Sequence, residues 1–172
     1  FRLITGNSDV RGNISIMLHD TLEYFFDLSG DNLSFEELSR IAGTKLRGDI
    51  KYKVTGGGKG GLIEGDALLD GIFFERKFED VRTGFRYENK NLSFRNISGK
   101  LFGAPLTGNG RLNFGVKPEE FHAEAEISNF NLSGLVFNSL DTDFNGKVEI
   151  DGRGFNDRDL FMSLEVDLDY TR

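Results

Sequence analysis

The 172-residue chain contains no cysteine, no tryptophan and only two prolines. The missing cysteines exclude disulfides, thiolate metal sites and thiol catalysis. No apolar run approaches the roughly 18 residues with which a helix spans a bilayer. Positive charge is also scarce: the net charge is −7, and lysine and arginine form no cluster. We therefore expect no nucleic-acid partner, because phosphate binding needs a basic patch.

The start of the sequence lacks the features of a newly made secreted protein. It begins with Phe1 instead of methionine, and no signal peptide is present. Residues 2–4 already have the character of a strand. We therefore expect the chain to be a piece of a longer protein.

Phenylalanine and glycine are abundant instead, with 17 and 22 residues. Disordered chains are poor in aromatic residues, so this composition argues against disorder. Glycine is common at the turns and bends of β-sheets. The composition therefore favours many strands, and the length fits one domain of ordinary size.

Residues 82–114 carry the clearest strand pattern. Apolar and polar residues alternate along this stretch, and the phase of the alternation shifts near Asn96-Ile97. Successive side chains of a strand point to opposite faces, so the pattern predicts strands with one apolar face and one wet face. The polar segment 88–91 and the Gly-Ala-Pro segment 103–105 predict short turns, which make neighbouring strands antiparallel.

The rest of the chain follows the same pattern, with one helix. Ser34 and Glu37 fit a capping box, in which the serine side chain accepts the amide three residues on and the glutamate reaches back. An apolar stripe follows, so we predict a helix near 34–42, and we interpret the glycine-rich residues 56–61 as a flexible hairpin turn. Further strands are expected at 10–16, 22–28, 46–54, 62–75, 78–88, 121–127, 148–150 and 160–170. The predicted fold is all-β: a long curved antiparallel meander sheet, half-pipe or β-taco like, with one short helix.

The alternation also repeats. Shifting the sequence by 98 or 99 positions places 12–16 on 110–114 and keeps the apolar phase of the strands that follow. We interpret residues 1–99 as a first β-repeat unit and residues 100–172 as a second, truncated unit that continues the same sheet. The alternative is that any antiparallel meander matches itself when shifted.

Several segments of the sequence resemble the AsmA-like/TamB superfamily of bacterial envelope proteins. The resemblance lies in Asn32-Leu33-Ser34 with its helix, in residues 45–50, in the phenylalanine strand 78–87, in 91–94, and in the Gly-x-Gly-x-Leu strand 106–112. It implies a half-pipe sheet standing in the periplasm, with an apolar inner face that carries phospholipid between the inner and outer membranes. It also implies an N-terminal inner-membrane anchor in the full-length protein and no catalytic residues.

A sheet with one apolar face must cover that face, either with a second layer, by closing on itself, or with a guest molecule. Burial of one phenylalanine or leucine is worth about 1.5–3 kcal/mol, so a whole strip of them is a strong driving force. The charged residues of the other face, for example Glu165, Asp167 and Asp169, are expected to form a solvated outer wall. The alternative is that the two units cover each other, or that the sheet curls until its own side chains fill it. We predict that a lipid groove is lined by Phe85, Tyr87, Leu112, Phe114, Phe121, Ala123, Ala125, Ile127, Val148, Ile150, Leu160, Met162, Leu164, Val166 and Leu168.

Other candidate sites are weak. His19 and His122 have no serine or cysteine partner in a recognisable frame, so both are expected to be solvated strand or turn residues. Residues 56–61 lack the Gly-Lys-Ser/Thr ending of a phosphate loop. The acidic residues of 141–143 and 151–159 could bind Ca²⁺, but their spacing fits no EF-hand loop and aspartate is common in turns. We therefore expect no cofactor, no metal and no catalytic residues.

These observations lead to three hypotheses of different kinds. The first is a non-enzymatic periplasmic groove that binds and conducts the acyl chains of phospholipid and so maintains the outer membrane. The second is a scaffold that docks a partner, such as an outer-membrane β-barrel protein, by adding a strand to its sheet edge. The third is an enzyme, for which the sequence offers no paired acid and base.

Overall fold

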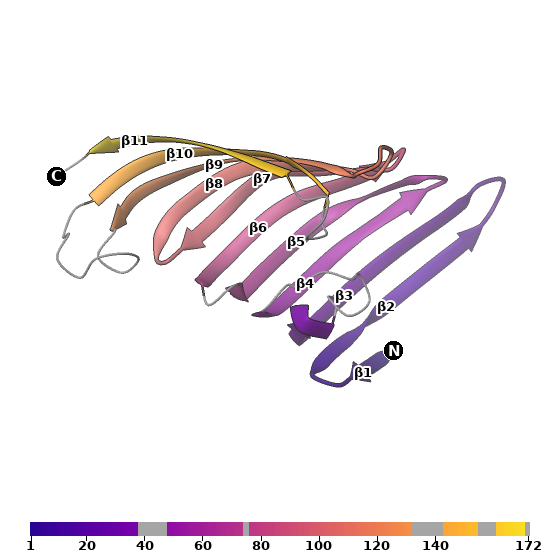
Figure 1. The fold of residues 1–172 in the computed structure, drawn as a ribbon. Helices are drawn as coiled ribbons and strands as arrows, with labels where there is room; N and C mark the ends of the chain where they lie inside the picture. Colours follow the sequence, from indigo (N-terminus) through magenta and orange to yellow (C-terminus); the bar gives the residue numbers. More distant parts are fainter. Residues whose placement is uncertain (38–47, 74–75, 132–142, 155–160, 171–172) are drawn as a thin grey trace.

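The computed structural model describes residues 1–37, 48–73, 76–131, 143–154 and 161–170. These residues form a single sheet in which each strand pairs antiparallel with its neighbours in sequence, in the order β1 to β11 (Figure 1). The predicted all-β antiparallel meander is therefore confirmed. The strands are β1 (Arg2–Thr5), β2 (Ser8–Leu18), β3 (Leu22–Ser34), β4 (Gly48–Lys59), β5 (Leu62–Phe73), β6 (Arg76–Glu88), β7 (Asn91–Leu101), β8 (Ala104–Asn113), β9 (Glu120–Asn131), β10 (Asp143–Arg153) and β11 (Phe161–Tyr170).

Tight turns explain why the strands follow one another as hairpins. The β6–β7 connection is Asn89-Lys90, with φ of 49° and 64°, and the β7–β8 connection is Phe102-Gly103, with φ of 55° and 80°. Two consecutive residues with positive φ form the turn whose twist matches the twist of the flanking strands. The predicted turn at 88–91 is confirmed.

Two of the predicted turns are placed wrongly. The first was set over residues 56–61, but Gly56–Lys59 belong to β4, and only Gly60-Gly61 form the turn to β5. The second was set over 103–105, but Ala104 and Pro105 already pair with β7. In both cases glycine and proline suggested a loop, whereas cross-strand packing keeps these residues in the sheet.

β-bulges at Asp80, Asn96 and Asn129 shift the alternation of side chains by one residue and so keep the apolar side chains of these strands on one face. Asp80, Asn96 and Asn129 have φ of 51°, 55° and 52°, and each lies where the pairing register between two neighbouring strands shifts. The N–H of each donates to a side-chain oxygen of an adjacent strand: Asp70 Oδ1 at 2.7 Å, Asn109 Oδ1 at 3.1 Å and Asn145 Oδ1 at 3.0 Å. A bulge leaves one residue out of the ladder and bends the strand. The phase shift predicted near Asn96-Ile97 is confirmed as such a bulge.

A hydrogen-bonded cluster ties the end of β3 to the β1–β2 hairpin. Residues 35–37 form a single helical turn, and the rest of the predicted helix lies outside the described residues. The Ser34 N–H donates to Ser8 Oγ at 3.1 Å, and the Glu37 carboxylate accepts from the Asn7 N–H at 2.6 Å and from Ser8 Oγ at 2.5 Å. The predicted bond from the Ser34 N–H to the Glu37 carboxylate is therefore replaced by bonds that both groups make with the nearby β1–β2 hairpin.

No second layer covers the sheet in the described part of the chain. Extensive packing joins only strands that are neighbours in sequence, and the sheet does not close on itself. Among the described residues, no helix has the length and apolar character needed to cross a membrane. The predicted boundary between repeat units, at residues 99 and 100, falls inside β7, and the division into repeats remains a prediction.

Candidate functional site: an uncovered apolar face

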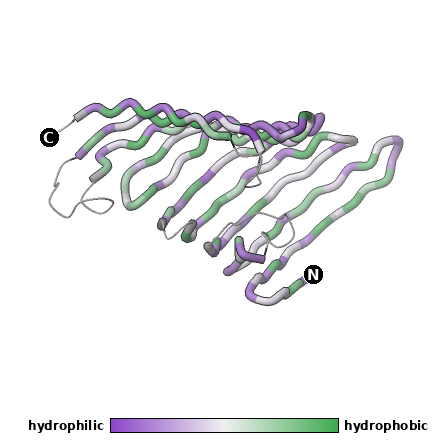
Figure 2. Tube along the Cα trace, in the orientation of Figure 1, coloured by the Kyte–Doolittle hydropathy of each residue, from purple (hydrophilic) through white to green (hydrophobic). Residues whose placement is uncertain are grey.

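The strand register sorts the side chains into two faces. Residues directly opposite each other on neighbouring strands point to the same side, so the pairing carries one face across the whole sheet. Figure 2 shows the result as alternating hydrophobic and hydrophilic segments along each strand. A row is a set of residues that face one another from strand to strand across the sheet. The side of the sheet that carries the row listed next is called the apolar face, and the opposite side is called the polar face. This row consists of Ile14, Phe26, Gly56, Gly65, Phe85, Phe94, Gly110, Ala123, Ile150 and Leu164.

Large and small residues alternate along the rows of the apolar face. Phe26 on β3 and Phe85 on β6 stack with ring centroids 6.5 Å apart, although two strands lie between them. Those strands carry Gly56 and Gly65 in the same row. A Cβ atom at Gly56 would lie 2.8 Å from the Phe26 ring, and one at Gly65 would lie 3.0 Å from the Phe85 ring. The rings therefore lie over the glycines, an arrangement that lets glycine stay in a strand.

The same arrangement recurs in the neighbouring row of β3 and β4 and again between β9 and β10. A Cβ atom at Gly58 would lie 2.5 Å from the Tyr24 hydroxyl, and one at Gly152 would lie 2.1 Å from the Phe121 ring. Both glycines face these rings directly across a strand pair. Because glycine has no side chain, the aromatic rings can lie against the backbone of the neighbouring strand and fill the space above it.

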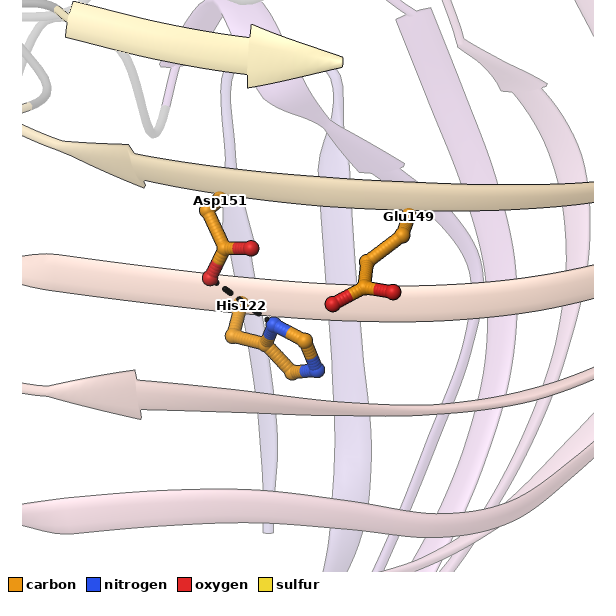
Figure 3. Close-up of side chains that lie close together, drawn as sticks. All are labelled: His122, Glu149 and Asp151. Carbon is orange, nitrogen blue, oxygen red and sulfur yellow. Dashed lines mark hydrogen bonds and ion pairs between the residues drawn. The ribbon is translucent and has the colours of Figure 1, made fainter. Parts of the chain in front are cut away.

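The sheet bends toward its apolar face. Figure 3 looks onto the polar face at β9 and β10, with the side chains of His122, Glu149 and Asp151 in front of the ribbon. The N-terminal strands, in purple, pass behind these two strands in the same view. The apolar face is therefore on the inside of the curve, as the predicted half-pipe requires.

Solvent reaches most of the apolar face. Ile50 and Tyr52 on β4 are among its best covered residues, at 9% and 8% exposure, while Ile16 and Leu164 near the two ends of the face are 63% and 57% exposed. No described side chain is fully buried. The accessible surface is 11670 Å², whereas a compact monomer of 19.3 kDa has about 8500 Å². Soluble monomers seldom leave so large an apolar surface uncovered unless it binds something.

Tyr52 brings a polar hydroxyl into a well-covered part of the apolar face. Its hydroxyl donates to the Asp9 carbonyl oxygen at 3.3 Å, and its ring lies over Gly30. Burial raises the pKa of Tyr52 above its ordinary value, and the nearby Asp9 carboxylate raises it further. The phenol is therefore held neutral and serves as a hydrogen-bond donor.

The register places all but two of the predicted groove residues on the apolar face. Phe114 lies just beyond the end of β8, where its N–H donates to the Lys90 carbonyl oxygen at 2.8 Å, and Leu160 lies outside the described residues. The others share one side: Phe85, Tyr87, Leu112, Phe121, Ala123, Ala125, Ile127, Val148, Ile150, Met162, Leu164, Val166 and Leu168. The prediction overlooked the N-terminal half of the face, for example Ile14, Phe26 and Val54, although these residues alternate just as clearly.

The polar face carries ion pairs and shallow hollows. Lys59 pairs with Glu23 at 2.6 Å and Arg86 with Glu88 at 2.8 Å, and such exposed pairs contribute little stability. One hollow, of about 490 Å³, is lined by polar groups such as Thr107. In the described part of the chain this face is mostly polar and charged, although exposed apolar side chains such as Met17, Phe25 and Phe161 also lie on it.

The polar face also carries a cluster of one histidine and two acidic side chains that the sequence pattern did not predict. His122 Nδ1 lies 2.9 Å from Asp151 Oδ1, and the Glu149 carboxylate lies beside them (Figure 3). His122 is therefore more than a solvated strand residue. Its partners are far away in sequence, so only the pairing of β9 with β10 could reveal them.

No protein-family model, curated protein or solved structure matches the chain. Its class is therefore defined by the fold and the site: a single open antiparallel sheet that presents one long apolar face. The resemblance of its segments to the AsmA-like/TamB superfamily stays a prediction.

Proposed function

We propose that this chain is a non-enzymatic groove module that binds the acyl chains of phospholipid along its apolar face. In this proposal it belongs to a longer, AsmA-like/TamB-type protein anchored in the inner membrane, stands in the periplasm, and conducts lipid between the two membranes to maintain the outer membrane. The observation that carries the proposal is the apolar face itself, which continues from β2 to β11 without a second layer in the described residues.

The energetics of an acyl chain suit such a surface. Burial of each CH₂ group is worth about 0.8 kcal/mol and needs no special polar partner. Strands lie about 4.8 Å apart, so the strands from β2 to β11 extend the face over roughly 43 Å. A chain can therefore shift along the rows from one strand to the next at nearly constant free energy, which is the requirement for conduction in place of tight binding.

Photocrosslinking in bacterial cells that make the protein tests this proposal. A photoreactive phenylalanine derivative at Ala125 or at Leu164 is expected to form phospholipid adducts, detected by mass spectrometry, because both positions are on the apolar face. The matched controls are Glu126 and Glu165, the next residues, whose side chains point to the polar face. Equal lipid adducts from both faces, or none from Ala125 and Leu164, would contradict the proposal.

A second function is supported by the sheet edge. β11 pairs with β10 on one side, and its other side has no strand partner in the described part of the chain. A long uncovered edge can accept a further strand. The chain would then act as a scaffold that docks an outer-membrane β-barrel protein during its assembly.

Proline at Val166 separates the two functions. Proline lacks the N–H group that a sheet ladder needs, but it remains apolar. Under the scaffold hypothesis, Val166→Pro abolishes crosslinks between β11 and the barrel protein, whereas lipid adducts from Ala125 persist. Val166→Thr keeps the N–H group and the β-branched shape, so it is expected to retain the crosslinks. Loss with both variants would mean that the side chain matters and the edge does not.

A further inference from the structure

The cluster on the polar face combines three side chains with metal-binding atoms. His122 comes from β9, and Glu149 and Asp151 come from β10, two residues apart and therefore on the same side of the strand. One ligand atom from each lies within 4.8 Å of the other two. In Figure 3 the imidazole and both carboxylates point toward a common centre.

The charges around the cluster favour a cation. Glu149 on β10 lies directly opposite Glu124 on β9 and directly opposite Glu165 on β11. Like charges in opposite positions of a sheet are destabilising. In the described residues no ion pair joins Glu149 to a lysine or arginine. Three positive charges lie nearby: Arg111 faces His122 from β8, and Lys147 and Arg153 lie on the same side of β10 as Glu149 and Asp151. Lys147 and Arg153 each face a glutamate of β9, Glu126 and Glu120, so the carboxylates still outnumber the cations.

We propose that His122, Glu149 and Asp151 form a binding site for a divalent first-row transition metal ion of the Zn²⁺ type. An imidazole together with carboxylates suits Zn²⁺ and its neighbours, whereas Ca²⁺ and Mg²⁺ prefer oxygen ligands alone. The ion would lie between His122 Nδ1 and Asp151 Oδ1, and the proton held in that hydrogen bond would leave to solvent. The Glu149 carboxylate would complete the set of protein ligands.

The geometry needs only small adjustments. Zn²⁺ binds nitrogen at about 2.0–2.1 Å and carboxylate oxygen at about 2.0–2.2 Å. The 2.9 Å separation of Nδ1 and Oδ1 must open slightly, and the Glu149 carboxylate must approach. The Asp151 side chain is 57% exposed, so it has the freedom to turn. A hollow of about 550 Å³ beside His122 and Asp151 gives the ion an entry path and leaves room for water on its open positions.

Calorimetric titration of the metal-free protein with Zn²⁺ tests the site. His122→Ala, Glu149→Gln and Asp151→Asn are each expected to weaken Zn²⁺ binding by at least about tenfold. Two controls are matched to these variants. His19→Ala removes the other histidine, which lies in the exposed β2–β3 turn, and Glu126→Gln removes an acid from the next row of the same face. Both controls are expected to bind like the wild type.

A nitrogen-detected NMR spectrum of the histidines gives a second readout. Zn²⁺ is expected to shift the Nδ1 resonance of His122 and to leave that of His19 unchanged. Absence of Zn²⁺ binding, unchanged binding by His122→Ala, or an equal loss with Glu126→Gln and Glu149→Gln would overturn the proposal. The site is on the face opposite the proposed lipid groove, so the two proposals fail independently.

Discussion

Gly56→Val is expected to lower the midpoint of urea unfolding strongly, by the equivalent of about 1–3 kcal/mol or more. A Cβ atom at this position would lie 2.5 Å from the backbone oxygen of Glu64 and 2.8 Å from the Phe26 ring. Backbone cannot move away as a flexible side chain does, so β5 and the stack of Phe26 on Phe85 must both shift. Circular dichroism during urea titration measures the effect.

The control for this substitution is Gly61→Val. Gly61 lies in the β4–β5 turn, and a Cβ atom added there would have nothing within 4 Å. The free energy of unfolding of Gly61→Val is expected to stay within about 0.5 kcal/mol of the wild-type value, as for other surface changes. Phe26→Ala combined with Gly56→Val is expected to cost less than the sum of the single changes, because the ring no longer competes for the space. An unchanged midpoint for Gly56→Val would mean that the rings do not lie over β4.

Leu164→Glu is expected to reduce phospholipid binding by at least about tenfold while the fold persists. The Leu164 side chain is 57% exposed without a guest, so a charge there meets water and the free energy of unfolding changes little. With an acyl chain bound, the same carboxylate would lose its water and the lipid would lose an apolar contact, and a loss of about 1.4 kcal/mol already equals a factor of ten. Partition of a fluorescent phospholipid between vesicles and the protein measures the affinity.

Ser163→Glu is the matched control for Leu164→Glu. It adds the same charge one residue earlier on β11, but its side chain points to the polar face. Lipid binding is therefore expected to remain at the wild-type level. Equal losses with both variants would point to a general effect of negative charge, and no loss with Leu164→Glu would contradict the proposed groove.

Local patterns in the sequence were sufficient to predict the strands and their faces. Leu164, Val166 and Leu168 alternate with acidic residues, and the structure places these three together on the apolar face. The shift of phase at Asn96-Ile97 was equally visible, because a bulge must move one residue out of the alternation. Side-chain direction in a strand depends only on position along the chain, so composition and order carry this information.

Features that depend on neighbouring strands could not be predicted in this way. Gly56 and Gly58 suggested a turn, because glycine in isolation favours no strand, yet both lie in β4 beneath the rings of Phe26 and Tyr24. The His122–Asp151 contact likewise requires the register of β9 against β10. In both cases the deciding contacts join residues far apart in sequence.

The alternation along the chain is enough to specify a meander of strands with one apolar and one charged side, because a period of two is a local property of the backbone. Three further features come from contacts between distant residues: the sheet stays open in its described residues, it bends toward its apolar side, and His122 lies beside Glu149 and Asp151. Closure, curvature and side-chain clusters depend on bulges, on strand register and on the fit of residues far apart in sequence, and no short stretch of sequence specifies these alone.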